Sequence, residues 1–155
     1  MSTLAENKRL VERYFDALDR FDLDEIGALM DPGLRFRAAG GTGARESVVF
    51  DSPEALLKDL RENVRVLYAP DPGLMPEILN LTAEDDRVAA EVRIRARSIQ
   101  TGEPYDNLYA FVFWIRDGRF VEIHEHLDTQ YVARQLLEPA GIASGAEMPW
   151  LQRSD

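Results

Sequence analysis

Apolar residues along the first part of the chain recur with the period of a helix. Residues 4–20 place apolar side chains three and four positions apart, which predicts an amphipathic helix. A second helix is predicted to begin after Asp22, whose side chain is suited to cap it, and its apolar residues continue to position 30. Asp31-Pro32-Gly33 is typical of a turn, so we expect the second helix to end there.

The next segment combines short strands with one more helix. Residues 34–38 and 48–50 have the apolar content of short strands, and Gly40-Gly41-Thr42-Gly43 lies between them. No Lys-Ser or Lys-Thr pair follows these glycines, so they indicate a flexible hairpin or lid rather than a phosphate-binding loop. Ser52 and Pro53 then open a third helix, since serine caps helices and proline fits the first helical position.

The second half of the chain alternates apolar and polar residues, as strands do. Asp85-Asp86 and Asp117-Gly118 are suited to the hairpin turns between such strands. Helices followed by an antiparallel meander predict an α+β fold in which the helices pack on one face of the sheet. The expected long strands cover residues 75–83, 87–100, 105–116 and 119–128.

One charged residue interrupts the apolar face of the last expected strand. Val121, Ile123 and Leu127 alternate along it, and Glu125 falls on the same face. A carboxylate is costly to bury unless it is paired or used, and burial raises its pKa toward the range of a general acid or base. Glu125 is therefore either a catalytic acid or base, or a structural carboxylate satisfied by a tyrosine, an arginine or backbone N–H groups.

Length and composition indicate a single soluble globular domain in this chain of 155 residues. No apolar run reaches the about 20 residues of a membrane span, and residues 1–10 lack the apolar core of a secretory signal. Cysteine is absent, which excludes disulfides, a thiol nucleophile and zinc–thiolate sites. We expect a cytoplasmic protein with a domain at residues 1–137 and a tail at 138–155 that packs back onto it.

The net charge of −10 argues against a nucleic-acid partner, because nucleic-acid binding depends on neutralising phosphates. A local exception is the basic stripe of Arg93, Arg95 and Arg97 at alternate positions of one strand. We expect acids of a neighbouring strand to pair with it on a solvated or subunit-contacting face. An anion site is the alternative.

The histidines of the chain, His124 and His126, share one face of the last strand with Glu122, at a spacing that could bind a metal. No third ligand is evident from the sequence. We therefore predict surface or subunit-contact histidines and no metal, unless a bulge near Glu122 turns them inward.

Several short motifs occur together over residues 5–135. They are Arg13-Tyr14-Phe15-x-Ala17-Leu18 with Asp22-Leu23-Asp24, then Gly102-x-x-Tyr105-x-Asn107, then Phe113-x-x-x-Asp117-Gly118-Arg119-Phe120-Val121-Glu122, then Glu125-x-x-Asp128. Together they resemble the SnoaL-like branch of the NTF2-like superfamily. That superfamily includes ketosteroid isomerase, scytalone dehydratase and limonene epoxide hydrolase, and also members without enzyme activity.

The resemblance implies a cone-shaped α+β fold, in which a curved and mostly antiparallel sheet encloses a pocket and N-terminal helices close one side. It also implies a homodimer formed through the outer sheet face. In this fold, the three arginines of the basic stripe would lie on the outer face of the sheet. The residues it would turn inward are Val88, Ala90, Val92, Ile94 and Ala96, then Asn107, Tyr109, Phe111 and Phe113, then Val121, Ile123, Glu125 and Leu127.

The catalytic groups of the named relatives are only partly kept. Of the catalytic residues of limonene epoxide hydrolase, only the carboxylate of the last strand has a counterpart here, Glu125. Val92 and Ile94 occupy the positions nearest to the catalytic arginine and aspartate of that enzyme. Tyr14 matches the tyrosine that stabilises the enolate oxygen in ketosteroid isomerase. The base of that isomerase falls near Ala38, and its second oxyanion donor falls near Tyr109 or Phe111.

These observations favour a cofactor-independent isomerase, dehydratase or lyase that acts on a small, mostly apolar or aromatic carbonyl or hydroxyl compound. Glu125 would move the proton, and Tyr14 and Tyr109 would stabilise the oxyanion. Asn107 could orient a substrate oxygen or could pin the hairpin backbone. The alternatives are a non-catalytic small-molecule-binding domain and an epoxide hydrolase. The expected walls of the site are Phe36, Leu57, Leu60, Met75, Ile94, Phe111 and Leu127.

Overall fold

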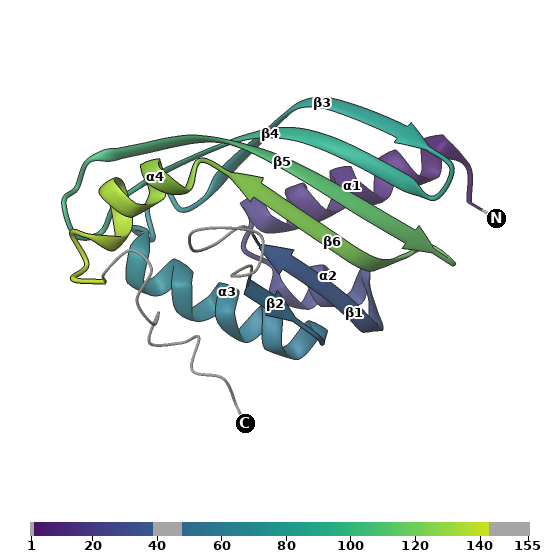
Figure 1. Ribbon diagram of the computed structural model, residues 1–155, viewed down its shortest axis with the longest axis horizontal. Helices are drawn as coiled ribbons and strands as arrows, with labels where there is room; N and C mark the ends of the chain where they lie inside the picture. Colours follow the sequence, from purple (N-terminus) through teal and green to yellow (C-terminus); the bar gives the residue numbers. More distant parts are fainter. Residues whose placement is uncertain (1, 39–47, 143–155) are drawn as a thin grey trace.

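The computed structural model describes residues 2–38 and 48–142 (Figure 1). The expected Gly40–Gly43 hairpin and the tail beyond residue 142 lie outside these described residues. The helical elements are α1 (Leu4–Asp19), α2 (Leu23–Ala28), α3 (Pro53–Leu67), α4 (Thr129–Val132) and the π-helical turn η2 (Ala133–Leu137). The strands are β1 (Met30–Ala38), β2 (Val48–Phe50), β3 (Met75–Glu84), β4 (Arg87–Arg97), β5 (Pro104–Arg116) and β6 (Arg119–Leu127).

Side-chain caps fix where the helices begin. The Thr3 hydroxyl accepts from the backbone N–H of Glu6, and the Glu6 carboxylate accepts from the N–H of Thr3, which closes a capping box before α1. Asp22 caps α2 and Ser52 caps α3, as their positions in the sequence predict. Asp128 caps α4 by accepting from the N–H of Tyr131.

The predicted end of α2 at Asp31-Pro32-Gly33 is wrong. The helix ends at Ala28, and these three residues lie inside β1. The carboxylate of Asp31 accepts from the N–H of Gly33 at 2.8 Å, and this local turn coincides with a shift in the pairing of β1 with β6. The turn residues therefore form an irregularity within a strand rather than a helix stop.

The strands form one mixed sheet of order β2-β1-β6-β5-β4-β3. β1 and β6 are parallel and the other neighbours are antiparallel. Figure 1 shows the sheet curving, with α1 behind β4–β6 and α3 beside β1 and β2. Asp117 and Gly118 turn the β5–β6 hairpin with φ values of 50° and 72°, the left-handed backbone that such tight turns require. The structure is the expected cone-shaped α+β fold.

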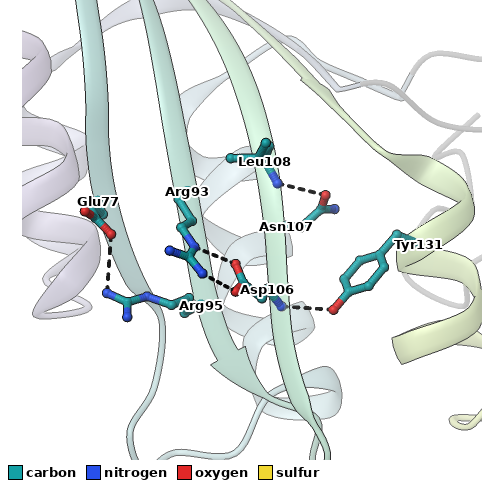
Figure 2. Close-up of polar contacts among 7 residues, drawn as sticks. All are labelled: Glu77, Arg93, Arg95, Asp106, Asn107, Leu108 and Tyr131. Atoms are coloured by element: carbon teal, nitrogen blue, oxygen red, sulfur yellow. Dashed lines mark hydrogen bonds and ion pairs between the residues drawn. The ribbon is translucent and has the colours of Figure 1, made fainter.

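The alternation along β4 and β5 separates a buried inner face from a charged outer face. The buried residues include Val92 and Ile94 of β4 and Phe113 of β5. On the outer face, Arg93 Nε donates to Asp106 Oδ1 at 2.7 Å and Arg95 Nη2 donates to Glu77 at 3.4 Å, as Figure 2 shows. The prediction that the arginines pair with acids on neighbouring strands is confirmed for Arg93 and Arg95. Arg97 instead donates to the carbonyl oxygen of Gly102 at 2.6 Å.

The inner face of the sheet packs against α1 through aromatic side chains. The Tyr14 ring lies 5.5 Å from that of Phe113 and 5.8 Å from that of Phe120, both edge-on. Phe15 contacts Phe111 in the same manner at 5.2 Å. These edge-to-face contacts join helix and sheet into one core.

A bulge in β6 corrects the predicted inward position of Val121. The β5–β6 pairing shifts so that Val121 has no partner, Ile115 faces Phe120 and Trp114 faces Glu122. Phe120 is fully buried in its place, while Ile123 stays buried as expected. The bulge precedes Glu122 and leaves Ile123, Glu125 and Leu127 on one face, so that the histidines remain on the other.

Within residues 2–38 and 48–142, no helix combines the length and apolar character needed to cross a membrane.

Candidate functional site

Glu125 lies on the inner face of β6, opposite Phe111 of β5 and Ala38 of β1 in the sheet register. Its side chain is half-buried, and its carboxylate forms no hydrogen bond or ion pair with any residue that the structure describes. Burial, and after it the negative charge of Asp59, raise the pKa of Glu125 to about 7. The carboxyl therefore exchanges its proton near neutral pH.

Asp59 of α3 is the second carboxyl of the site, and the sequence analysis missed it. Burial raises its pKa to about 6, opposed by a hydrogen bond from Asn63 and assisted by the charge of Glu62. Asn63 Nδ2 donates to Asp59 Oδ2 at 2.6 Å. The second carboxyl oxygen of Asp59, Oδ1, and the amide oxygen of Asn63, Oδ1, are buried and have no hydrogen-bond partner among the residues that the structure describes.

A signal for Asp59 and Asn63 was present in the sequence. Both stand three or four positions from apolar residues of the buried stripe, which runs from Leu56 to Leu67. They interrupt an apolar stripe of a helix as Glu125 interrupts the apolar face of a strand. The wider helical period makes that interruption harder to recognise, because charged residues at the border of the stripe are common.

The charge of Asp59 acts on Glu125. It contributes to the pKa of Glu125, and burial raises the pKa of both. The pKa of Asp59 is the lower of the two, so Asp59 loses its proton first and Glu125 keeps its proton to higher pH.

A network of tyrosines borders Glu125 on the β5 side. The hydroxyls of Tyr105 and Tyr109 are 2.6 Å apart, and Asn107 Nδ2 donates to Tyr105 at 3.0 Å. Tyr68 joins them, with its ring 5.5 Å from that of Tyr105. Burial raises the pKa of Tyr68, Tyr105 and Tyr109, and the charge of Glu125 adds to each of these shifts. All three hydroxyls therefore stay protonated and can donate hydrogen bonds.

The side chain of Asn107 forms its hydrogen bonds with other groups of the protein. Its Oδ1 accepts from the backbone N–H of Leu108 at 2.9 Å, which Figure 2 draws, and its Nδ2 also lies 3.4 Å from the carbonyl oxygen of Asp128. These contacts fit the interpretation of Asn107 as a residue that pins the hairpin backbone and holds Tyr105.

Tyr14 approaches from α1, on a different side from the tyrosine network. It is buried among the rings of Phe15, Phe113 and Phe120. Burial raises the pKa of Tyr14 well above its ordinary value, and the charge of Glu125 adds to the shift. Tyr14 and Tyr109 are therefore both electrostatically coupled to Glu125, although they come from separate elements.

The expected wall residues lie on the inner side, with one exception. Met75 pairs with Arg95 in the β3–β4 ladder, which puts it on the outer face with the arginines. A shift of one position along a strand reverses the face, and the turn before β3 gives no sequence signal that fixes this register. The others are the buried Phe36, Ile94 and Phe111, and the partly buried Leu57, Leu60 and Leu127 that pack against the core.

The outer face of β6 holds the residues considered for metal binding. His124 Nε2 is 2.7 Å from the carboxylate of Glu122, and its ring packs on Trp114 at 4.6 Å. Among the residues that the structure describes, no group of three or more His, Cys, Asp or Glu side chains is arranged to hold a metal ion. These histidines thus lie away from Glu125.

Comparisons with known proteins agree with this fold. The profile of a family described as SnoaL-like domain matches residues 11–123. No curated protein matches the sequence.

Solved structures with the same architecture come from several bacteria. AclR, a putative hydroxylase from Streptomyces galilaeus, is 20% identical with a TM-score of 0.71, and the match covers 91% of this chain and 100% of that one. An NTF2-like protein of unknown function from Burkholderia pseudomallei is 18% identical with a TM-score of 0.74, covering 88% and 98%. A putative SnoaL-like polyketide cyclase from Jannaschia is 20% identical with a TM-score of 0.71, covering 88% and 95%. At these identities the likeness shows the NTF2-like fold.

Proposed function

The chain belongs to the SnoaL-like domain family, and from this premise we propose that it is a cofactor-independent enzyme that works by general acid/base catalysis. Its substrate is a small, mostly apolar or aromatic carbonyl or hydroxyl compound. The observation that carries the proposal is Glu125, a half-buried carboxyl on an aromatic inner face whose pKa of about 7 suits proton transfer at neutral pH.

In the proposed reaction the ionised Glu125 takes a proton from a carbon next to the substrate carbonyl. Efficient proton transfer needs a group whose pKa lies near the working pH, and burial provides that match. Apolar walls such as Phe36, Ile94 and Phe111 exclude water and hold the apolar body of the substrate. The protonated Glu125 then returns the proton to the product or to solvent.

Tyr109 and Tyr14 are the proposed donors to the oxygen that becomes negative during the reaction. Each hydroxyl stays protonated, because burial and the charge of Glu125 raise the tyrosine pKa. Tyr105 lies 2.6 Å from the Tyr109 hydroxyl and can fix its direction. Donors that are oriented before the reaction stabilise a developing oxyanion without a reorganisation cost.

The printed descriptions of two structural neighbours support the substrate class. One is described as a putative polyketide cyclase and another as a putative hydroxylase. Polyketides are rich in carbonyl and hydroxyl groups, which agrees with an inner face built from aromatic rings and polar hydroxyls. Isomerisation, dehydration and lyase steps all fit this combination of base and oxyanion donors.

A second candidate function is non-catalytic binding of the same class of molecule. The observation that favours it is the internal use of the polar groups: Asn107 bonds to Tyr105 and to backbone atoms, and Tyr105 bonds to Tyr109. An aromatic carbonyl compound would still stabilise a domain of this kind against unfolding, but the compound would not be converted.

A ligand screen with product analysis tests the proposal. Steroid-like, terpenoid and aromatic carbonyls and alcohols are added to the protein, stabilisation is measured by thermal shift, and each hit is analysed by mass spectrometry for conversion. We expect at least one hit to be converted, and Glu125→Gln to abolish conversion while the fold and ligand binding remain. Glu122→Gln, on the outer face of the same strand, is the matched control and should keep activity. Full activity in Glu125→Gln would exclude Glu125 as the base.

A cytoplasmic location and a homodimer formed through the outer sheet face complete the proposal. Leu108 supports such an interface, because its side chain on that face is 61% exposed beside the Arg93–Asp106 pair. Light scattering on the purified protein should give the mass of a dimer. A monomer mass at micromolar protein concentration would contradict the proposed dimer interface.

A further inference from the structure

The side-chain amide of Asn107 has a fixed orientation, because each of its ends contacts a backbone group that can act in one way only. The N–H of Leu108 donates to Asn107 Oδ1 at 2.9 Å, and the carbonyl oxygen of Asp128 lies 3.4 Å from Nδ2. A backbone N–H only donates, and a carbonyl oxygen only accepts. The amide nitrogen therefore lies on the side of Tyr105, and it donates to the Tyr105 hydroxyl at 3.0 Å.

This orientation determines where the hydroxyl of Tyr105 sends its own proton. The Tyr105 oxygen accepts from Asn107, and an amide nitrogen cannot accept a hydrogen bond in return. The Tyr109 hydroxyl lies 2.6 Å from that of Tyr105, a distance typical of a short O–H···O hydrogen bond, and both residues are buried. Donation from Tyr105 to Tyr109 leaves no buried proton of Tyr105 without a partner.

The proton of Tyr109 is then directed toward the inner face of the sheet. Tyr109 pairs with Leu127 in the β5–β6 ladder, and Glu125 lies two positions before Leu127 on the same face. Tyr109 and Glu125 are therefore diagonal neighbours, at a separation that long side chains can bridge. An ionised carboxylate attracts the proton of a hydroxyl and repels its lone pairs, so the charge of Glu125 favours the same direction.

The opposite direction of the network has a different consequence. In it Tyr109 donates to Tyr105, and Tyr105 donates to Tyr68, whose ring lies 5.5 Å from the Tyr105 ring. The Tyr109 oxygen would then present lone pairs to the inner face, where the charge of Glu125 makes them unfavourable. The two directions predict different partners for Tyr109, a hydrogen-bond acceptor in the first case and a donor in the second.

We propose that Asn107 and Tyr105 are positioning residues, which direct the proton of Tyr109 toward a carbonyl oxygen of the bound molecule. This inference rests on the proposed function and narrows its substrate class from carbonyl or hydroxyl compounds to carbonyl compounds. A carbonyl oxygen accepts the hydrogen bond of Tyr109 and has no proton of its own to place. The same hydrogen bond strengthens when Glu125 removes a neighbouring proton and the carbonyl becomes an enolate.

A measurement without any ligand tests the direction of the network. The tyrosine rings are labelled with ¹³C, and the downfield hydroxyl protons are recorded by ¹H NMR. Through-bond correlations to ring carbons identify the tyrosine that owns the proton of the 2.6 Å hydrogen bond, with Tyr105→Phe and Tyr109→Phe providing the assignments. We expect the proton to belong to Tyr105. A proton that belongs to Tyr109, or the absence of any protected hydroxyl proton between the two, would overturn the inference.

The substitution Asn107→Asp should reverse the direction. It keeps an oxygen that accepts from the N–H of Leu108 and replaces the donating nitrogen with an accepting oxygen. Tyr105 should then donate to that oxygen and accept from Tyr109, so the shared proton should correlate with the Tyr109 ring in the same NMR experiment. Asn80→Asp makes the same chemical change at an exposed position of β3 and is the matched control. It should leave the shared proton on Tyr105.

Three matched ligands test the class of the bound molecule: methyl naphthyl ketone, the corresponding secondary alcohol and ethylnaphthalene. The carbonyl stretching frequency of the bound ketone should lie below its value in a hydrocarbon solvent, because Tyr109 donates to it. In Asn107→Asp this shift should disappear, and the affinity for the ketone relative to the alcohol should fall about fivefold, the effect of about one hydrogen bond. Ethylnaphthalene has no oxygen and should bind both proteins equally. If Asn107→Asp does not fold, Tyr105→Phe takes its place and should change the ketone-to-alcohol ratio in the same direction.

Failure of this inference and failure of the proposed function give different results. An unshifted carbonyl stretch in the wild type, or the same ketone-to-alcohol ratio in Asn107→Asp and Asn80→Asp, would overturn the roles of Asn107 and Tyr105. Binding of none of the three compounds would overturn the assigned ligand class. If the ketone binds with a shifted stretch but does not exchange its α-protons with deuterated solvent, the direction of the network stands and the role of Glu125 as a base fails.

Discussion

At the scale of single residues, the site is a compromise between stability and chemistry. Glu125 takes a position between Ile123 and Leu127 where an apolar side chain would suit the core, and no residue that the structure describes compensates its charge with a hydrogen bond or ion pair. Burial therefore favours its protonated form. A buried carboxyl without a compensating partner lowers the stability of the folded protein when it is ionised.

This cost gives stability a defined dependence on pH. The pKa of Glu125 is about 7 in the folded protein and near 4.5 when unfolded, so between these values the folded state binds more protons. The free energy of unfolding therefore falls as pH rises from about 4.5 to 7. Glu125→Gln removes this contribution, and its stability relative to wild type should increase by about 2 kcal/mol between pH 4.5 and 8, after allowance for partial exposure.

Urea unfolding of wild type and Glu125→Gln across that range measures the difference. The difference between the two proteins removes the contributions that other acids make to the pH dependence of stability. Asp106 is one of these acids: Arg93 lowers its pKa, so its contribution to stability increases as pH rises. Glu122→Gln serves as the outer-face control. Parallel stability curves for wild type and Glu125→Gln would show that Glu125 is solvated like an ordinary surface acid.

The contrast between Glu125 and Asp59 shows how far sequence can locate such residues. A strand has a period of two, so one charged residue among alternating apolar ones is conspicuous, and Glu125 was identified on that ground. Asp59 lies on a helix with a broader apolar stripe, where an aspartate at the border looks like a surface residue. Tyr68 was missed for a different reason, because its ring contact with Tyr105 of β5 joins separate elements and leaves no periodic pattern.

At the scale of elements, local chemistry predicted where helices begin better than where they end. The predicted caps at Asp22 and Ser52 act within three residues, so the sequence around each contains the whole interaction. The start of β1 depends instead on its parallel partner β6, more than 80 residues away in sequence. There Met30 pairs with Phe120, and Asp31-Pro32-Gly33 is tolerated within a strand.

Strand faces were predictable wherever alternation was uninterrupted. β4 and β5 keep a regular ladder over their whole length, and the predicted inward residues from Val88 to Phe113 are buried or lie in the core. The errors at Val121 and Met75 come from a bulge and from a register set by the partner strand. Both are properties of strand pairing, which a single strand does not contain.

At the scale of the whole molecule, the change of apolar period along the chain predicted the architecture. The helices precede most of the strands in the sequence. The two kinds of element bury their apolar faces against each other, which requires the helices to lie on one side of the sheet. The curvature visible in Figure 1 brings α1, α3 and the inner face of β6 around the same region. For this reason, and not through any local motif, the charge of Asp59 acts on Glu125, which lies 66 positions away in the sequence.

The aromatic contact between α1 and the sheet should be the principal support of this arrangement. Phe113 is fully buried, and its ring lies 5.5 Å from Tyr14, 6.0 Å from Phe15 and 4.9 Å from Phe120. Phe113→Ala leaves a cavity where helix and sheet meet and should lower the free energy of unfolding by about 3–5 kcal/mol. Chemical denaturation followed by circular dichroism measures this loss.

The matched control is Leu79→Ala on β3, where the side chain is 49% exposed, and it should change the free energy of unfolding by less than about 0.5 kcal/mol. Because Phe113 joins the helix to the sheet that carries Glu125, its removal should also lower the titration midpoint of Glu125 as water reaches the inner face. A loss below about 1 kcal/mol with an unchanged Glu125 midpoint would mean that helix and sheet are held together mainly by other contacts. The position of the site would then not depend on the aromatic core.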